Sequence, residues 1–342
     1  MTDQLRIGAC LSLTGRFAQF GRQAALGLET WRSLDGTANV IVEDDRSDRQ
    51  TLEAVLPDVA ARCDILLGPY STILMRSAGR IAADSGRLIW NHGGSGDDVE
   101  QAHPGHVVSV LTPTSQYAEP FLRYIASSDE APRDLYIVQG PGSFGRQVAE
   151  GAAMIALQLG VRAIRAEPGE FPASPMPREW DLFSAGVFEQ DAELVAKSLR
   201  LPDPPRRVCT VAAGVREFAR AVGDPEGVFG IAQWFPGSGH EVSLGPYEEE
   251  FLRVYAASGG VPDYPAAQAA AGAVIAIHCA RLAGSTNRHE LWAAAAGLEA
   301  STFFGAFKIN PQSGAQVGHR AVLVRWAGGR PAPVSMPVPM TR

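Results

Sequence analysis

Residues 7–29 read IGACLSLTGRFAQFGRQAALGLE, an apolar run that turns at Gly15 into a pattern of helical period. The run predicts a strand over Leu5–Leu13, and the period predicts a helix over Gln19–Leu34. The same succession returns in residues 135–151, LYIVQGPGSFGRQVAEG, where FGRQ again opens the helical pattern. A repeat of strand, glycine-containing turn and helix indicates two structurally related lobes.

Short apolar runs alternate with helical patterns along the rest of the chain. We expect further strands at residues 40–42, 65–67, 88–90, 107–110, 135–138, 208–211 and 228–232, and helices at residues 48–61 and 74–84. The segment 168–207 is expected to hold a helix over Leu182–Leu199 between loops, and the tail Gly329–Arg342 to lie extended on the surface. This alternation predicts an α/β fold in which helices flank both faces of parallel sheets.

The composition is that of a globular protein with more than one domain. The 342 residues are 46% hydrophobic and 20% charged, and 37 acidic against 30 basic residues give a net charge of −7. This length exceeds that of a usual single domain. The acidic balance argues against a nucleic-acid partner or an anionic membrane surface. We find no uninterrupted apolar stretch long enough to predict a membrane-spanning helix.

The four cysteines, at positions 10, 63, 209 and 279, form no CxxC pair. Their spacing argues against a zinc site and against a disulfide scaffold, although one disulfide stays open. Cys10 and Cys209 lie in apolar runs, which predicts buried thiols. We expect no metal and no cofactor. The amino terminus MTDQLRIGACLSLTG has no signal-peptide pattern. We therefore expect an extracytoplasmic protein if a leader has been removed, and a cytoplasmic one if Met1 is the native start.

Residues 140–145, GPGSFG, match the pattern G-x-G-x-x-G between a predicted strand and a predicted helix. Glycines placed in this way admit a dinucleotide pyrophosphate to a helix N-terminus, and Glu167 stands where a ribose-binding acid is expected. An NAD(P)-dependent oxidoreductase using Gly140–Gly145 is therefore one hypothesis. Against it, the first copy of the turn, Leu13–Phe17, lacks the pattern, and no hydride-transfer residues follow.

Two strand ends carry hydroxyl groups near glycines. Tyr70, Ser71 and Thr72 follow one predicted strand, and Gly93 and Ser95 follow the next. Hydroxyls beside the N–H groups of a helix start make a cradle for a carboxylate or an amide. Ser and Thr at these places are equally typical of helix N-caps, so the hydroxyls alone do not establish a ligand site.

Several segments together resemble a known family, the type I periplasmic solute-binding proteins. They are residues 7–29, DDRSD at 44–48, LLGPYSTILMRSAGRIAADSGRLIWNHGGSGDD at 66–98, VVSVLTPTSQYAEPFLRYI at 107–125, GPGSFGRQVAEG at 140–151 and HRAVLVRWAGGR at 319–330. The resemblance covers nearly the whole chain. Within the family, the chain is most similar to the leucine-binding-protein-like branch, which serves ABC transporters for branched-chain amino acids, amides and urea. It implies two Rossmann-like lobes, 1–116 with 240–318 and 117–239 with 319–342, joined by a multi-crossing hinge around a ligand cleft.

The resemblance also implies site residues. Thr72 and Ser95 match the hydroxyl residues that hold an amino-acid carboxylate, and Gly93 matches the residue whose carbonyl accepts from the ligand amine. Phe20 and Phe144 match aromatic positions that wall the ligand from each lobe.

The family's acid that pairs with the ligand ammonium falls near Gln233 or Trp234, and a second acidic position falls near Thr114, so both are neutral here. A buried ammonium without a carboxylate partner is costly. We therefore expect a ligand with a carboxylate or amide end and no obligatory ammonium, in a pocket with aromatic walls. Asp97 or Asp98 would restore the missing charge if their loop folds inward.

These observations predict a binding protein and not an enzyme. We expect hinge closure around an amino acid, or a related carboxylate or amide, and delivery of this solute to an ABC permease. Two alternatives stay open. One is a cytosolic amide or amino-acid sensor on the same fold that controls a regulator, and the other is the NAD(P)-dependent oxidoreductase.

Overall fold

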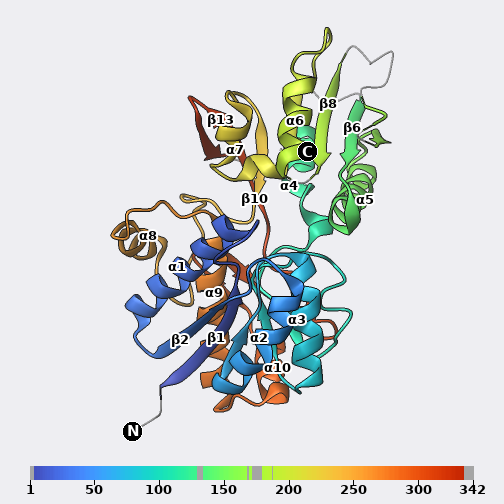
Figure 1. The fold of residues 1–342 in the computed structure, drawn as a ribbon. Coiled ribbons are helices and arrows are strands. Elements are labelled where there is room, and N and C mark those ends of the chain that lie inside the picture. The colour runs from blue at the N-terminus through green and yellow to red at the C-terminus, as the bar shows by residue number, and fades with distance from the viewer. Residues whose placement is uncertain (1–3, 129–133, 168, 172–178, 187, 335–342) are drawn as a thin grey trace, which may run out of the picture. The chain divides into compact units, whose positions relative to one another are not determined.

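The structure is a computed structural model that describes residues 4–128, 134–167, 169–171, 179–186 and 188–334. The chain forms two compact units: unit 1 comprises Met1–Pro113 and Gly239–Arg320, and unit 2 comprises Thr114–Ser238 and Ala321–Arg342. From the sequence we expected the chain to pass from one lobe to the other after residues 116, 239 and 318. Each unit holds parallel strands flanked by helices (Figure 1), so the predicted α/β fold class is confirmed.

Unit 1 is built on a five-stranded parallel sheet in the order β2-β1-β3-β4-β5. Its strands are β1 (Leu5–Leu11), β2 (Ala38–Asp44), β3 (Ile65–Leu67), β4 (Ile89–Asn91) and β5 (Val107–Ser109). Its helices are α1 (Ala18–Asp35), α2 (Arg49–Arg62), α3 (Thr72–Asp84), α8 (Glu248–Ala256), α9 (Tyr264–Ala283) and α10 (Arg288–Gly297). A separate two-stranded sheet pairs β11 (Ala300–Thr302) with β12 (Gly305–Phe307).

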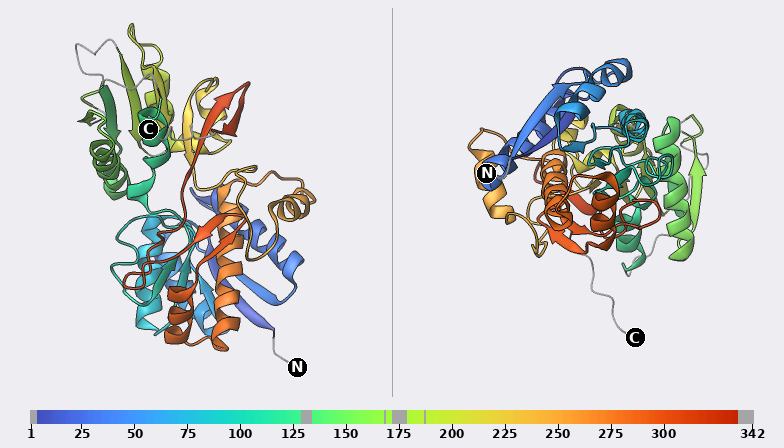
Figure 2. Two further views of the ribbon diagram at one scale, coloured as in Figure 1. Left: turned by 180° about the vertical axis from the view of Figure 1, so that it is seen from behind. Right: turned by 90° about the horizontal axis from the view of Figure 1, so that it is seen from below.

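Helices cover both faces of the unit 1 sheet, α2 and α3 on one side and α1 and α9 on the other (Figures 1 and 2). The core under α2 and α3 includes Cys10, Leu56, Leu66 and Met75. Helix α9 is long and apolar enough to cross a membrane by length and composition, with a mean hydropathy of 1.3, but 78% of that window is buried inside the protein. It is therefore a core helix of unit 1.

Unit 2 is built on a seven-stranded sheet in the order β14-β13-β10-β9-β8-β6-β7. Its strands are β6 (Asp134–Gln139), β7 (Ala163–Ala166), β8 (Trp180–Ala185), β9 (Arg207–Thr210), β10 (Phe229–Ala232), β13 (Val322–Ala327) and β14 (Arg330–Pro333). Its helices are η1 (Thr114–Gln116), α4 (Glu119–Ala126), α5 (Gly142–Gln158), α6 (Phe188–Ser198), η2 (Ala212–Gly214) and α7 (Phe218–Val222). The strands β13 and β14 are antiparallel additions to the parallel part.

The repeat seen in the sequence is a repeat of topology. The parallel strands of unit 2, β7-β6-β8-β9-β10, stand in the same order as β2-β1-β3-β4-β5 of unit 1. The repeated motif forms the start of α1 in one unit and of α5 in the other. A Cβ atom on Gly27 would lie 2.2 Å from the carbonyl oxygen of Ala266, and one on Gly151 would lie 2.1 Å from that of Ser115. The repeated glycines thus let each helix approach a neighbouring backbone.

One sequence prediction for residues 168–207 is wrong. The helix expected over Leu182–Leu199 begins only at Phe188, because residues 180–185 form the buried strand β8. In the predicted tail, Arg330–Pro333 is extended and mostly exposed, as expected, and pairs with β13 as strand β14. The rest of that predicted tail, residues 335–342, lies outside the described residues.

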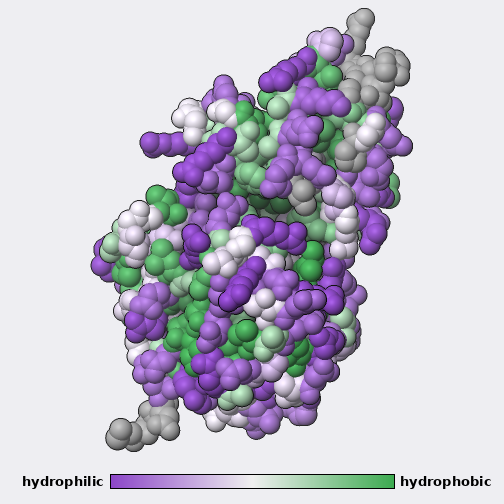
Figure 3. All heavy atoms as spheres, in the orientation of Figure 1, coloured by the Kyte–Doolittle hydropathy of each residue, from purple (hydrophilic) through white to green (hydrophobic). Residues whose placement is uncertain are grey.

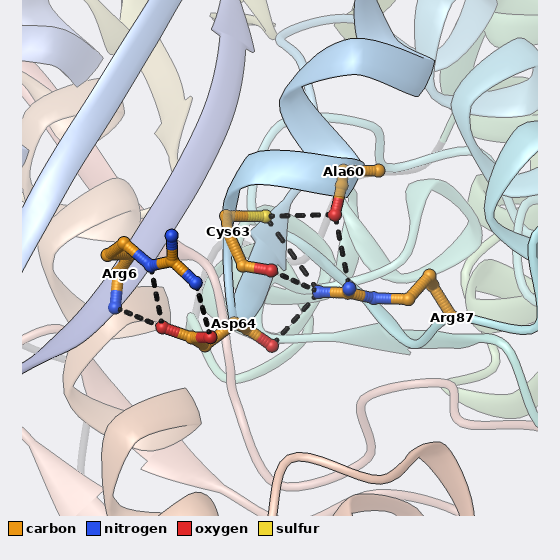
Figure 4. A network of polar contacts seen from close by, with 5 residues as sticks. All are labelled: Arg6, Ala60, Cys63, Asp64 and Arg87. Atoms are coloured by element: carbon orange, nitrogen blue, oxygen red, sulfur yellow. Dashed lines mark hydrogen bonds and ion pairs between the residues drawn. The ribbon is translucent and has the colours of Figure 1, made fainter. Parts of the chain in front are cut away.

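A polar network closes the amino-terminal edge of the unit 1 sheet (Figure 4). The guanidinium of Arg87 donates to the carbonyl oxygens of Ala60, Cys63 and Asp64 at 3.0–3.1 Å, and the carboxylate of Asp64 accepts from Arg6. Arg87 thereby satisfies carbonyl groups at the end of α2 that the helix leaves unpaired. This network is structural and lies at the sheet edge opposite to the strand ends considered below.

Hydrophilic and hydrophobic residues are mixed over the face that Figure 3 presents. The large apolar side chains that are exposed in the described part of the chain sit on several separate elements: Ile73, Met154, Leu157, Leu199, Tyr247, Val261, Leu282 and Val317. Exposed apolar side chains scattered in this way are ordinary for a globular protein.

All four cysteines are free and buried. Burial raises the pKa of the Cys10 and Cys279 thiols to about 12, so both remain protonated near neutral pH. The thiols therefore contribute to packing, as their positions in apolar runs predict.

Candidate functional site

The candidate site of unit 1 lies at the carboxyl ends of its parallel strands, which meet at one edge of the sheet. Tyr70 and Ser71 occupy the turn from β3 to α3, and Thr72 is the first residue of α3. Gly93 and Ser95 lie in the loop of residues 92–96, called here the β4 loop, and Phe20 lies in the first turn of α1. The fold thus brings the six predicted residues of unit 1 to the ends of neighbouring strands.

The turn after β3 and the β4 loop are joined through their backbones. The N–H of Ser71 donates to the carbonyl oxygen of Gly93 at 3.0 Å. A Cβ atom on Gly93 would lie 2.6 Å from the carbonyl oxygen of Pro69, so only glycine permits this approach. Ser71 has a φ of +88°, in the left-handed region that non-glycine residues rarely adopt. This contact already uses the Gly93 carbonyl, which the resemblance assigned to the ligand amine.

The hydroxyls of Ser71 and Thr72 have different roles. The Ser71 Oγ accepts from the N–H of Leu74 at 3.4 Å and so caps α3. The Thr72 Oγ1 accepts from the N–H of Gly96 at 3.1 Å. A hydroxyl that accepts one hydrogen bond still has a hydrogen to donate. Thr72 makes no such donation within the described part of the chain, so its hydrogen is available to an oxygen of a ligand.

Aromatic side chains border these hydroxyls. The rings of Phe20 and Tyr70 are stacked, with centroids 4.7 Å apart and planes 13° apart, and Phe17 lies tilted against Tyr70 at 6.1 Å. The hydroxyl of Tyr70 is 2.7 Å from that of Tyr264, the first residue of α9. All four rings are half-buried. We call Phe17, Phe20, Tyr70 and Tyr264 the aromatic cluster.

A buried amide that the sequence analysis missed holds the β4 loop in place. The Nδ2 of Asn91 donates to the carbonyl oxygen of Gly94 and to the Oγ of Ser109, both at 2.6 Å. Its Oδ1 accepts from the N–H groups of Gly93 at 3.2 Å and Gly94 at 2.8 Å. Asn91 and Ser109 are directly paired on the neighbouring strands β4 and β5. The only hint in the sequence was a polar residue at the end of an apolar strand.

The acidic residues near this edge have structural partners. The Arg76 guanidinium forms a two-pronged ion pair with Asp98, at 2.7 and 2.9 Å. The Oδ1 of Asp44 accepts from the N–H groups of Leu13 and Arg46, and the Oδ1 of Asp45 accepts from the Ser12 hydroxyl at 2.6 Å. Asp44 and Asp45 therefore join the turn after β1 to the turn after β2. Among the described residues, no group of three or more His, Cys, Asp or Glu side chains is arranged to hold a metal.

Three predicted site residues belong to unit 2. Phe144 lies in the first turn of α5, half-buried and edge-on to Tyr117 with centroids 5.9 Å apart. Gln233 and Trp234 follow β10 and are 4% and 1% exposed. The neutral Thr114, also considered from the resemblance, opens η1 and is fully buried.

The glycine pattern at 140–145 has a packing role in unit 2. A Cβ atom on Gly140 would lie 2.5 Å from the carbonyl oxygen of Ala185, and one on Gly145 would lie 2.4 Å from that of Gly140. The turn from β6 to α5 thus packs against the end of β8. The contacts account for these two glycines without a bound dinucleotide.

A separate cavity of about 290 Å³ in unit 1 lies between α1, α9 and residues 244–250. Its lining includes Leu34 and Asp35, at the end of α1, and Arg281, near the end of α9. Because α1 runs back from the carboxyl ends of the strands, its last residues lie toward the opposite edge of the sheet. This cavity is therefore not part of the candidate site.

Comparisons with known proteins agree with the fold. A family model described as periplasmic binding protein matches residues 4–176, and no match was found among curated protein sequences. A leucine binding protein from Thermotoga maritima has a TM-score of 0.78 and 14% identity, covering 97% of this chain and 98% of that chain.

Two further solved structures carry a ligand. A solute binding protein of an ABC transporter from R. palustris, in complex with 4-hydroxybenzoate, has a TM-score of 0.77 and 12% identity over 96% of this chain and 95% of that chain. A substrate-binding protein of an ABC transporter from Desulfitobacterium hafniense, in complex with Leu, has a TM-score of 0.77 and 14% identity over 96% of this chain and 99% of that chain. At these identities the structural likeness establishes the fold.

Proposed function

The chain belongs to the periplasmic binding protein family, and from this premise we propose that it binds a small solute with a carboxylate or amide end and delivers it to an ABC transporter permease. The similar structures are named as binding proteins, which supports a non-catalytic role. Their names also support the transporter as partner.

The available hydroxyl hydrogen of Thr72 is the observation that carries the proposal. Its oxygen is fixed by the N–H of Gly96, so the hydroxyl is oriented before a ligand arrives. A fixed donor costs little entropy when it binds an oxygen, and a charge-assisted bond to a carboxylate is stronger than one to a neutral group. Ser95, which is 7% exposed in the β4 loop, supplies a second hydroxyl to the carboxylate or amide end of the ligand in this proposal.

We further propose that the ligand lacks an obligatory ammonium group. The half-buried aromatic cluster favours an apolar or aromatic body next to the carboxylate. The positions where the family carries an acid are Gln233 or Trp234 and Thr114 in this chain. The neutral residues offer an ammonium no ion pair, and a buried unpaired charge is costly. In the proposal Phe144, Gln233 and Trp234 of unit 2 meet the same ligand when the two units close on it.

A thermal-shift screen of protein freed of endogenous ligand by unfolding and refolding tests this function. The probes are 4-hydroxybenzoate, benzoate, benzamide, leucine, phenylalanine, urea and NAD(P). A ligand at 100 times its Kd adds about 2.7 kcal/mol of stability, which a melting curve resolves. We expect benzoates or benzamide to raise the melting temperature more than leucine does.

The double variant Thr72→Ala with Ser95→Ala is the matched test of the site. We expect it to lose the ligand-induced shift while its melting temperature without ligand changes little. Equal shifts in variant and parent would place the ligand elsewhere, and a shift with NAD(P) alone would replace the proposal by the oxidoreductase. Deleting the gene should lower cellular uptake of the solute that binds, and unchanged uptake would contradict delivery to a permease.

A further inference from the structure

A buried carboxyl group lies behind the β4 loop. Glu100 is 4% exposed, and its Oε1 accepts a hydrogen bond from the hydroxyl of Ser109. Its Oε2 is buried and has no hydrogen-bond partner among the residues that the structure describes. Neither the family resemblance nor the candidate site uses this residue.

The hydrogen bonds between Glu100 and the β4 loop have a fixed direction. Asn91 must present Nδ2 to the carbonyl oxygen of Gly94 and Oδ1 to the N–H groups of Gly93 and Gly94. Its second Nδ2 hydrogen therefore goes to the Oγ of Ser109. Ser109 accepts from Asn91 and must donate its own hydrogen onward, and Glu100 is the acceptor.

We propose that Glu100 in its neutral form is a positioning residue of the solute site, holding the β4 loop in its binding geometry through Ser109 and Asn91. The loop carries Gly93 and Ser95, and its last residue Gly96 fixes the Thr72 hydroxyl. The proposal rests on the proposed function for the identity of the site. The link from Glu100 to the loop stands on contacts within unit 1 alone.

The charge of Glu100 decides whether this link holds. A neutral carboxyl still accepts from Ser109, whereas a carboxylate leaves a charged Oε2 buried without a donor. Burial, reinforced by the charge of Asp97, raises the pKa of Glu100 to about 7. Above that pH we expect residues 97–106, the segment that carries Glu100 between the β4 loop and β5, to open and admit water to Oε2. This opening would displace the β4 loop.

Groups from β4, β5, α3 and its own segment surround Glu100. From β4 and β5 it meets Asn91 and Ser109, which do not titrate. Helix α3 packs on the segment where Gly79 lies beside Val99, His103 and Val107. Three ion pairs involve α3 and this segment: Arg76 with Asp98, and Arg80 with Asp84 and Glu53. Asp97 of the segment is the acid whose charge acts on Glu100. Burial lowers the pKa of His103.

Two variants of Glu100 separate its hydrogen bond from its charge. Glu100→Gln keeps an oxygen for Ser109 and cannot ionise, whereas Glu100→Leu removes the acceptor. Glu299→Gln is the control, because Glu299 is an exposed acid of the same unit that pairs with Lys308. Ser109→Ala breaks the link without touching the carboxyl.

Amide hydrogen exchange of the ligand-free protein, corrected for intrinsic rates, is the first measurement. In the parent and in Glu299→Gln, we expect protection of residues 92–96 to fall about tenfold as the pH rises from about 6 to about 8.5. Glu100→Gln should keep its protection over the whole range, and Glu100→Leu and Ser109→Ala should have little at any pH. A Glu100→Gln profile that follows the parent would overturn the proposal, and so would full protection in Ser109→Ala.

Titration with benzoate over the same pH range is the second measurement. Affinity scales with the population of the binding-competent loop, so the parent Kd should rise about tenfold while that of Glu100→Gln stays level. If benzoate does not bind the parent, the ligand class of the proposed function is wrong, and the exchange experiment still decides the role of Glu100. If Glu100→Gln does not fold, Ser109→Ala decides by the same two measurements.

Discussion

The ring of Phe20 lies stacked on the ring of Tyr70, with centroids 4.7 Å apart and planes 13° apart. One ring comes from the first turn of α1 and the other from the turn after β3, so the stack joins two strand ends of unit 1. Both rings keep exposed area. The pair is therefore suited to contact a ligand as well as to brace the sheet edge.

Replacing Phe20 by Ala should weaken the binding of benzoate by about tenfold, because an aromatic pair contributes about 0.5–1.5 kcal/mol beyond the area that it buries. Stability should fall only modestly, since Phe20 is half-buried. Isothermal titration calorimetry measures the Kd. Phe188→Ala is the control, because Phe188 is also half-buried beside an aromatic ring but lies on α6 of unit 2. If both variants bind as the parent does, the aromatic cluster does not contact the solute.

Ser71 should respond differently to Gly and to Ala. Its φ of +88° is unfavourable for any residue with a Cβ atom, and its Oγ accepts the cap bond from Leu74 at a long 3.4 Å. Glycine removes the strain and is nearly as good an N-cap, so Ser71→Gly should stabilise the protein by about 1 kcal/mol. Ser71→Ala keeps the strain and loses the cap, so it should destabilise by about 1 kcal/mol. Urea unfolding measures both, and equal effects would contradict the strain argument.

The strands were predictable because both faces of each sheet are covered. In β6, Leu135 and Ile137 belong to one core cluster, and Tyr136 and Val138 belong to another. Such a strand appears in the sequence as a continuous apolar run. The strand β8 was missed because its apolar run directly precedes the helix α6, and periodicity cannot separate a short buried strand from a buried helical turn.

The candidate site was predictable only where it follows the chain locally. Thr72 and Ser95 could be named as candidates because they match the family's hydroxyl residues and lie near glycines after two strands. Tyr264 was not found, because it reaches the hydroxyl of Tyr70 from 194 residues away in the sequence. Glu100 was missed for a related reason, since its proposed role depends on the pairing of β4 with β5. Contacts of this kind arise from the tertiary fold and leave no local pattern.

Replacing Gly27 by Ala should destabilise unit 1 by about 2 kcal/mol or more, as overpacking of a tight contact does. The new Cβ atom would lie 2.2 Å from the carbonyl oxygen of Ala266, so α1 and α9 must separate. Gly297→Ala is the control, because a Cβ atom there meets nothing within 4 Å at the end of α10. Thermal unfolding measures both variants. A Gly27→Ala protein as stable as Gly297→Ala would show that the close approach of the two helices is not required.

A second buried acid, Asp191 of α6, joins the ends of two strands of unit 2, β8 and β9. Its Oδ1 accepts from the hydroxyl of Ser184 and from the N–H of Gly186 at 2.9 Å, and its Oδ2 accepts from the N–H of Ala212 at 3.2 Å. These donors favour the carboxylate, but complete burial outweighs them and raises the pKa of Asp191 to about 7. In the unfolded chain the same group has its ordinary pKa near 3.8.

The contribution of Asp191 to the stability of the protein should therefore fall as the pH rises through this interval. Between the unfolded and folded pKa values the folded state holds a proton that the unfolded state has released, so raising the pH from about 4 to about 7 favours unfolding, by about 4 kcal/mol at most. Asp191→Asn should be less stable than the parent at low pH, because its Nδ2 would face the N–H of Ala212. The difference in the free energy of unfolding should shrink toward pH 7, because the parent loses the stabilisation that protonated Asp191 gives it. Urea unfolding at several pH values measures the free energy, with the exposed Asp224→Asn as control. A difference between parent and Asp191→Asn that stays constant with pH would mean that Asp191 is ionised throughout, and that its three donors outweigh its burial.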